Sequence, residues 1–131
     1  RLLDIFSGTT SVGKVAETLA YEVVSLDLIN ADINCNILFW DYRVYPVGFF
    51  DVVWASPLVL NTAKKNIRQK NIVEANRIVL KHYKLLIIFN RGFTLLKIPR
   101  TGLLKNQEFM QGLPYVDVDY CMYGMPYRKR T

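Results

Sequence analysis

Apolar residues in this chain gather into short runs that are separated by turn residues. Four of these runs have the length of a β-strand and are expected to form strands: residues 2–6, 22–28, 51–55 and 85–89. The last run is apolar throughout and rich in β-branched and aromatic residues, which is typical of a central strand buried on both faces. The runs therefore predict a sheet of parallel strands.

Helical spacing of apolar residues appears between these runs. Residues 11–20 predict a helix with Val15, Ala16 and Leu19 on its inner face, and residues 71–82 predict a second helix. Three weaker expectations follow: a short helix over residues 106–112, a late strand over residues 115–123, and a loop or strand over residues 37–40. Alternating strands and helices indicate an α/β fold with a doubly wound, mostly parallel sheet and helices on both faces.

Length and composition limit the class of protein. The 131 residues allow one domain with one core, and an apolar content of 51% favours a folded chain. No run is long enough to span a membrane, and no secretory signal is visible. Cys35, Cys121 and His82 do not have the spacing of a metal site or of a disulfide framework, so we expect no metal and a reducing, intracellular setting. The chain begins on a core strand without Met, which indicates a truncated piece of a longer protein.

Charge is distributed unevenly along the chain. Residues 1–60 carry three basic and seven acidic side chains, whereas residues 61–131 carry fourteen basic and four acidic ones. A basic second half is typical of a protein that faces a polyanion. A solvated basic helix face is the alternative interpretation.

The first strand leads into the most informative segment, residues 4–13. A strand, a glycine-bearing turn and a helix in this order form a cradle for a nucleotide-type cofactor, because glycine lets the backbone approach a ligand and the helix start offers free N–H groups. Asp27 ends the second strand, fourteen residues after Gly13, and an acid there can accept hydrogen bonds from ribose hydroxyls. The alternative interpretation is that residues 4–13 form an ordinary turn between a strand and a helix, without a cofactor.

With its elements in this order, the chain resembles the DNA cytosine-5 methyltransferases, especially short viral and phage-like members. These are S-adenosylmethionine (SAM) enzymes with a Rossmann-like sheet. The resemblance rests on four blocks: residues 4–13, 24–28, 51–57, and 99–101 with 123–131. It implies one methyltransferase-like catalytic domain over residues 1–131, without the target-recognition region. It also implies a virus-associated protein in the cytoplasm or nucleus of a host.

The resemblance implies a SAM site at the ends of the first strands. Thr10 stands where the family usually has Gly, and its side chain could crowd the methionine part of SAM. Asn36 stands where the family often has Asp, and its carbonyl can still accept from the adenine amine. The implied cofactor-binding residues are Asp4, Phe6, Ser7, Gly8, Thr9, Thr10, Gly13, Asp27, Leu28, Asn36, Ile37 and Pro57.

Both chemical positions of the family are altered. Val59 stands where the family has the nucleophilic Cys, which attacks carbon 6 of cytosine. Lys97 stands where the family has the Glu that protonates ring nitrogen 3. Arg128 and Arg130 match the family's alternating arginines, which contact phosphate and brace the Glu. Arg100 is kept as the Glu-Asn-Pro motif would have it, and it borders the implied space for the flipped cytosine. Cys121 lies far along the chain and is not expected to replace the missing thiol.

These features lead to two hypotheses. The first is a methyltransferase-like domain that binds SAM and flips a cytosine from duplex DNA but lacks methylation activity. Its phosphate contacts would come from Lys64, Lys65, Arg68 and Lys129. The second is a non-catalytic module that uses the same scaffold to hold DNA, a protein partner or an assembly. The altered positions are either natural, or they arise because the stated sequence was inferred or engineered and differs locally from that of an active parent protein. A methyltransferase that acts on an exocyclic amine is a weaker third interpretation, because the required Asp/Asn-Pro-Pro-aromatic loop is missing.

Overall fold

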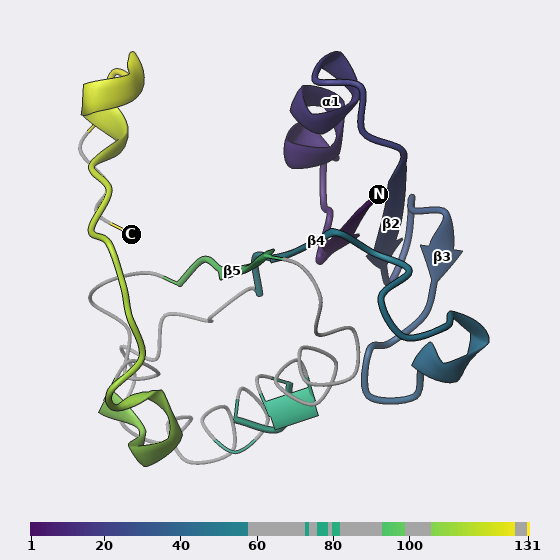
Figure 1. The fold of residues 1–131 in the computed structure, drawn as a ribbon. Coiled ribbons are helices and arrows are strands. Elements are labelled where there is room, and N and C mark those ends of the chain that lie inside the picture. Colours follow the sequence, from purple (N-terminus) through teal and green to yellow (C-terminus); the bar gives the residue numbers. More distant parts are fainter. Residues whose placement is uncertain (58–72, 74–75, 79, 82–92, 99–105, 128–130) are drawn as a thin grey trace. The chain divides into compact units, whose positions relative to one another are not determined.

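Five strands of the computed structural model form one sheet in which every neighbouring pair runs parallel. The structure describes residues 1–57, 73, 76–78, 80–81, 93–98, 106–127 and 131. Figure 1 shows the strands beside the single labelled helix. Their bounds are β1 Leu2–Ile5, β2 Val23–Asp27, β3 Ile33–Asn34, β4 Val52–Ala55 and β5 Phe93–Leu96.

The order of the strands across the sheet is β3-β2-β1-β4-β5. From β1 the chain moves outward to β2 and β3, and it then returns to the other side of β1 to form β4 and β5. This reversal is the switch point of a doubly wound sheet. The predicted Rossmann-like α/β fold is therefore confirmed, and the strands expected at residues 2–6, 22–28 and 51–55 correspond to β1, β2 and β4.

By its internal contacts the chain divides into two compact units. The first comprises Arg1–Leu58 and Arg77–Leu96, and it contains the sheet, the helix α1 (Ser11–Thr18) and the 3-10 turn η1 (Tyr42–Val44). The second comprises Val59–Asn76 and Lys97–Thr131, and it contains the 3-10 turns η3 (Glu108–Met110) and η4 (Tyr120–Tyr123). Within the described residues, no helix combines the length and the apolar character that a membrane crossing requires.

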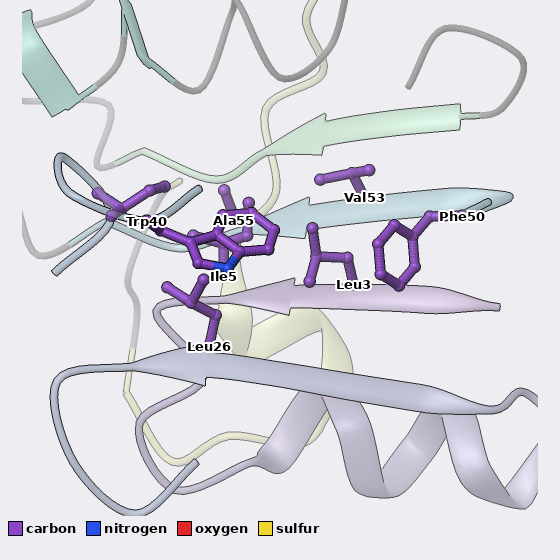
Figure 2. Packing of buried hydrophobic residues seen from close by; sticks show 8 residues of the cluster. Leu3, Ile5, Leu26, Trp40, Phe50, Val53 and Ala55 are labelled. Atoms are coloured by element: carbon purple, nitrogen blue, oxygen red, sulfur yellow. The ribbon is translucent and has the colours of Figure 1, made fainter. Parts of the chain in front are cut away.

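The hydrophobic core lies on one face of β1, β2 and β4. Alternate strand residues point to this face, and the segment between β3 and β4 covers them with aromatic side chains. Each large side chain that is removed from water here contributes roughly 1.5–3 kcal/mol. Figure 2 shows the packing of Leu3, Ile5, Leu26, Trp40, Phe50, Val53 and Ala55. Residues 37–39, for which a loop or strand was expected, form a turn that places Ile37 in this core.

The helix α1 packs on the opposite face of the sheet through small residues. Gly13 and Ala16 are buried, whereas Val15 and Leu19 are 61% and 67% exposed, so the predicted inner face is wrong for these two residues. The reason is the closeness of the helix to the sheet, because a Cβ on Gly13 would lie 3.2 Å from a methyl carbon of Val23. The helix also ends at Thr18, two residues earlier than expected.

Two further expectations need correction. Residues 115–123 do not form a strand: residues 113–118 are irregular, and η4 follows at Tyr120–Tyr123. The backbone of Val118 exchanges two hydrogen bonds with Thr131, and Val116 is 82% exposed instead of packing into a core as the inner side of a strand would. The short helix expected at residues 106–112 is reduced to η3.

Sequence reasoning also missed β5, which pairs with β4 at the edge of the described sheet. Its sequence is Phe-Thr-Leu-Leu, and its side chains are half-buried or exposed, with Phe93 at 80%. The strand expected at residues 85–89 lies outside the described residues, as does most of the helix expected at residues 71–82.

The core packing generates a test of stability. Phe50 is 1% exposed and Phe39 is 81% exposed. We expect Phe50→Ala to lower the free energy of unfolding by about 3–5 kcal/mol, because it leaves a cavity in the core. Phe39→Ala serves as the matched control and should change stability by less than about 0.5 kcal/mol. Urea unfolding followed by tryptophan fluorescence measures both, and equal losses would contradict the assigned core.

A second test concerns the residue before α1. Thr10 is the N-cap and has a φ of 57°, yet its hydroxyl donates to the Thr9 carbonyl (2.7 Å) instead of capping the helix. A left-handed backbone costs a β-branched residue roughly 1–2 kcal/mol. We expect Thr10→Gly to raise the free energy of unfolding by about 1 kcal/mol. The control Thr9→Gly, at a position without positive φ, should lower it, and a loss of stability in Thr10→Gly would refute the strain.

Candidate functional site

The carboxyl ends of β1, β2 and β4 meet at one edge of the sheet. Ile5 is in register with Leu26 on β2 and with Ala55 on β4, so the three strands end side by side. The segments that follow are residues 6–10, residues 27–30 and residues 56–57. Because this edge lies at the switch point, it is where ligands bind in sheets of this type.

The loop after β1 turns sharply before α1 begins. Phe6, Gly8 and Thr10 all have positive φ, at 62°, 52° and 57°. The turn is closed by the Thr10 amide, which donates to the Ser7 carbonyl (2.7 Å). A Cβ on Gly8 would meet nothing within 4 Å, so glycine is needed there for its backbone conformation and leaves open space beside the loop. Thr9 is exposed next to it.

Asp27 ties this loop to the end of β2. Its Oδ2 accepts a hydrogen bond from the Gly8 amide (2.8 Å), and its Oδ1 accepts one from the Leu28 amide (2.6 Å). A carboxylate has about four acceptor sites, so two backbone bonds leave capacity for ligand hydroxyls. The structure therefore brings together three of the residues that were assigned to the cofactor: Gly8, Asp27 and Leu28.

Asp4 is a buried acid on β1, beneath the first turn of α1. It is 1% exposed, and its Oδ2 has no hydrogen-bond partner among the described residues. Burial raises the pKa of Asp4 to about 6, the Gly13 amide opposes this rise, and the negative charge of Asp27 adds to it. The Oδ2 atom lies 3.6 Å from the position that a Cβ on Gly13 would take, which is ordinary van der Waals contact.

Ser7 is a second buried polar residue at the same edge. It is 8% exposed, and its hydroxyl also has no partner among the described residues. A buried polar group without a partner costs roughly 1–3 kcal/mol. The unpartnered atoms of Asp4 and Ser7 are therefore what we expect of a binding site in which a polar ligand supplies the missing hydrogen bonds.

Asn36 and Leu28 lie on adjacent segments of this edge. The pairing of β2 with β3 continues past the strands, because the Cys35 amide donates to the Asp27 carbonyl (2.8 Å). The side-chain carbonyl of Asn36 already accepts from the Leu38 amide (2.9 Å), so it has one further lone pair for a ligand. Leu28 is 64% exposed and can offer an apolar surface. Ile37 is buried in the core, away from solvent.

The segment after β4 is held to β1. The Ser56 amide donates to the Ile5 carbonyl (3.2 Å), the Trp54 indole N–H donates to the Ser56 hydroxyl (3.0 Å), and Pro57 is buried. The position of the expected nucleophile, Val59, follows two residues later and lies outside the described residues. The arginines of the expected catalytic set and the lysines and arginine expected to contact DNA also lie outside the described residues: Lys64, Lys65, Arg68, Arg100, Arg128, Lys129 and Arg130.

Lys97 is the only described residue of the expected catalytic set, and it belongs to the second unit. Its ammonium nitrogen lies 5.7 Å from the centre of the Tyr120 ring, a cation–π contact. Cys121 is exposed in η4 of the same unit. Among the described residues, no group of three or more His, Cys, Asp or Glu side chains could hold a metal ion.

Sequence reasoning missed one pair that supports the site. The backbone N–H and the hydroxyl of Ser25 both donate to Oδ2 of Asp32 (2.8 and 2.6 Å), and these bonds hold the pKa of Asp32 below its ordinary range. The Asp32 amide in turn donates to the Ser25 hydroxyl (2.9 Å), which fixes the connection after Asp27. The sequence feature that could have indicated this pair is the polar Ser25 within an otherwise mostly apolar strand.

The burial of Asp4 generates a pH prediction. Its folded pKa of about 6 lies above the ordinary 3.8, so the fold binds the proton more tightly than the unfolded chain does. The stability from Asp4 is full below pH 3.8 and is lost as the pH rises through 6. We expect Asp4→Asn to be more stable than wild type at pH 7.5 by on the order of 2 kcal/mol, with little difference at pH 4. Urea unfolding at the two pH values measures this, and an equal difference at both would contradict it.

No protein-family model matches the chain, and no solved structure is significantly similar to it. One curated relative aligns with the entire chain. It is described as a probable DNA (cytosine-5)-methyltransferase and comes from Frog virus 3 (isolate Goorha). The two sequences are 31% identical over 147 aligned positions, which cover 100% of this chain and 68% of the relative. Taken with the parallel sheet and its order, this similarity shows that the chain belongs to the DNA cytosine-5 methyltransferase family.

Proposed function

We propose that this chain is a methyltransferase-like domain that binds SAM and DNA, and that it has lost most or all cytosine methylation activity. The observation that carries the proposal is the pair of hydrogen bonds from the Gly8 and Leu28 amides to Asp27 at the switch point of the sheet. Family membership supplies the cofactor class, since the relative's name is that of a DNA (cytosine-5)-methyltransferase.

Residues at the carboxyl edge have the chemistry to hold SAM, which supplies an activated methyl group when it is bound. The spare lone pairs of Asp27 would accept from the ribose hydroxyls, and the Asn36 carbonyl would accept from the adenine amine. Leu28 would cover one side of the adenine ring. The unpartnered atoms of Asp4 and Ser7 support this placement, because a polar ligand beside the loop would satisfy them.

Loss of activity follows from the two substituted positions. Methylation at carbon 5 of cytosine needs a thiolate that attacks carbon 6 and an acid that protonates ring nitrogen 3. Val59 cannot form a covalent bond to the base. Lys97 reverses the charge of the acid, and its ammonium already contacts the ring of Tyr120, a contact that a glutamate would not make.

DNA is the proposed nucleic-acid partner. The excess of positive charge in residues 61–131 would attract the phosphate backbone, and Lys64, Lys65, Arg68, Arg100, Arg128, Lys129 and Arg130 are the proposed contacts. Each phosphate contact adds to the dependence of binding on salt. Affinity for duplex DNA should therefore fall steeply as the salt concentration rises.

A non-catalytic module that holds DNA or a protein partner is the second candidate function. The second unit favours it, because Tyr115 and Tyr123 are 84% and 76% exposed there. Exposed tyrosine is enriched at the cores of interfaces. In this case, binding of DNA or of a partner would not require SAM.

Calorimetry and transfer of a labelled methyl group test the proposal. We expect the wild-type chain to bind SAM and duplex DNA but to transfer no label. The double variant Val59→Cys with Lys97→Glu restores the nucleophile and the acid, and it should transfer label to DNA. Val59→Ala with Lys97→Glu is the matched control, since it has the acid but no thiol, and it should remain inactive.

The outcomes separate the candidates. Transfer by the wild-type chain, or its absence in the Val59→Cys, Lys97→Glu variant that still binds SAM, would count against the inactivated-enzyme interpretation. DNA binding by a chain that shows no heat with SAM, even after Thr10→Gly, would favour the non-catalytic module.

A further inference from the structure

Asp4 is a buried acid without a counter-ion among the described residues. It faces α1 from β1, and its neighbours in register are Ser25 on β2 and Trp54 on β4, which carry no charge. The charged group that acts on it is Asp27, which is also an acid. On α1, the ammonium of exposed Lys14 lies 3.5 Å from the Thr9 carbonyl, and Glu17 is exposed.

A cation is therefore the missing component of this edge. An ionised carboxyl that is almost fully buried is unfavourable unless it is paired. The Oδ2 atom of Asp4 and the hydroxyl of Ser7 are both buried and unpartnered, so two independent groups mark the same region as incomplete. A ligand that brings positive charge to this edge would stabilise the ionised form of Asp4, whereas a neutral ligand would not.

We propose that Asp4 is the specificity-determining residue that makes this edge favour the more positively charged cofactor, so that binding of SAM releases more of the proton from Asp4 than binding of the demethylated product does. This inference rests on the proposed SAM site. SAM carries a sulfonium charge that S-adenosylhomocysteine lacks, while both ligands have the same amino acid and adenosine groups. Their difference therefore isolates the effect of the sulfonium charge.

The size of the effect follows from linkage. The pKa of Asp4 is about 6, so near pH 6 about half of the molecules are protonated. If SAM binds the ionised form, it should release about half a proton at pH 6, and its affinity should rise about tenfold between pH 5 and pH 7. The affinity for S-adenosylhomocysteine should rise less over the same range.

Isothermal calorimetry of the full 131-residue chain at pH 6, in two buffers with different ionisation enthalpies, counts the protons released with each ligand. We expect more release with SAM than with S-adenosylhomocysteine. Asp4→Asn should abolish the difference and reduce the preference for SAM at pH 7. Glu17→Gln, which removes one acidic charge from the exposed side of α1, is the matched control and should leave both unchanged.

Equal proton release with the two ligands in the wild-type chain would overturn the inference and leave the proposed function intact. So would a difference that persists in Asp4→Asn. Absence of binding by either ligand, in the wild-type chain and in Thr10→Gly, would instead contradict the proposed SAM site. The wild-type comparison needs no variant to fold, so the test does not depend on the stability of Asp4→Asn.

Discussion

The contact between the carboxylate of Asp27 and the backbone of the first loop is the constraint on which the candidate site depends. Backbone bonds from the Phe6 and Ser7 amides to the Leu26 carbonyl hold the start of the loop to β2, and the bond from the Gly8 amide to Asp27 extends this attachment to the middle of the loop. The parallel register of β1 with its two neighbours brings the loop and the acid to the same edge. The bond to Asp27 therefore positions the acid against the chain's first turn, at the point at which the order of strands reverses.

Stability and ligand binding oppose each other at this edge. Positive φ at Phe6 and Thr10 is unfavourable for residues with a side chain, and the buried Asp4 and Ser7 leave polar atoms unpartnered. The packed aromatic and aliphatic core on the other face of the sheet offsets these terms. Strained backbone and unpartnered buried polar atoms that occur together in one loop region are typical of a site that a ligand completes.

Membership of the family is compatible with the proposed loss of activity. The sheet, the glycine loop and the acid at the end of β2 need only backbone geometry and one carboxylate, and these are present. A nucleophile and an acid are single side chains, so their proposed replacement by Val59 and Lys97 would remove the reaction without altering the sheet. The ammonium of Lys97 contacts the ring of Tyr120.

The sequence by itself determined the fold class, the strands β1, β2 and β4, and the loop with Asp27, because apolar runs, glycine and a terminal acid are local signals. It did not reveal that Gly13 joins Ala16 against the sheet in place of Val15 and Leu19, since that depends on how closely α1 approaches Val23. Nor did it reveal β5, because its pairing with β4 joins segments that are far apart in the sequence. The alternating pattern at residues 115–123 did not reveal that Val116 is 82% exposed and that η4 forms at Tyr120–Tyr123, because burial depends on tertiary packing. The protonation of Asp4 was also decided by tertiary structure alone, because a pKa is set by the burial and the charges that surround the group in the folded chain.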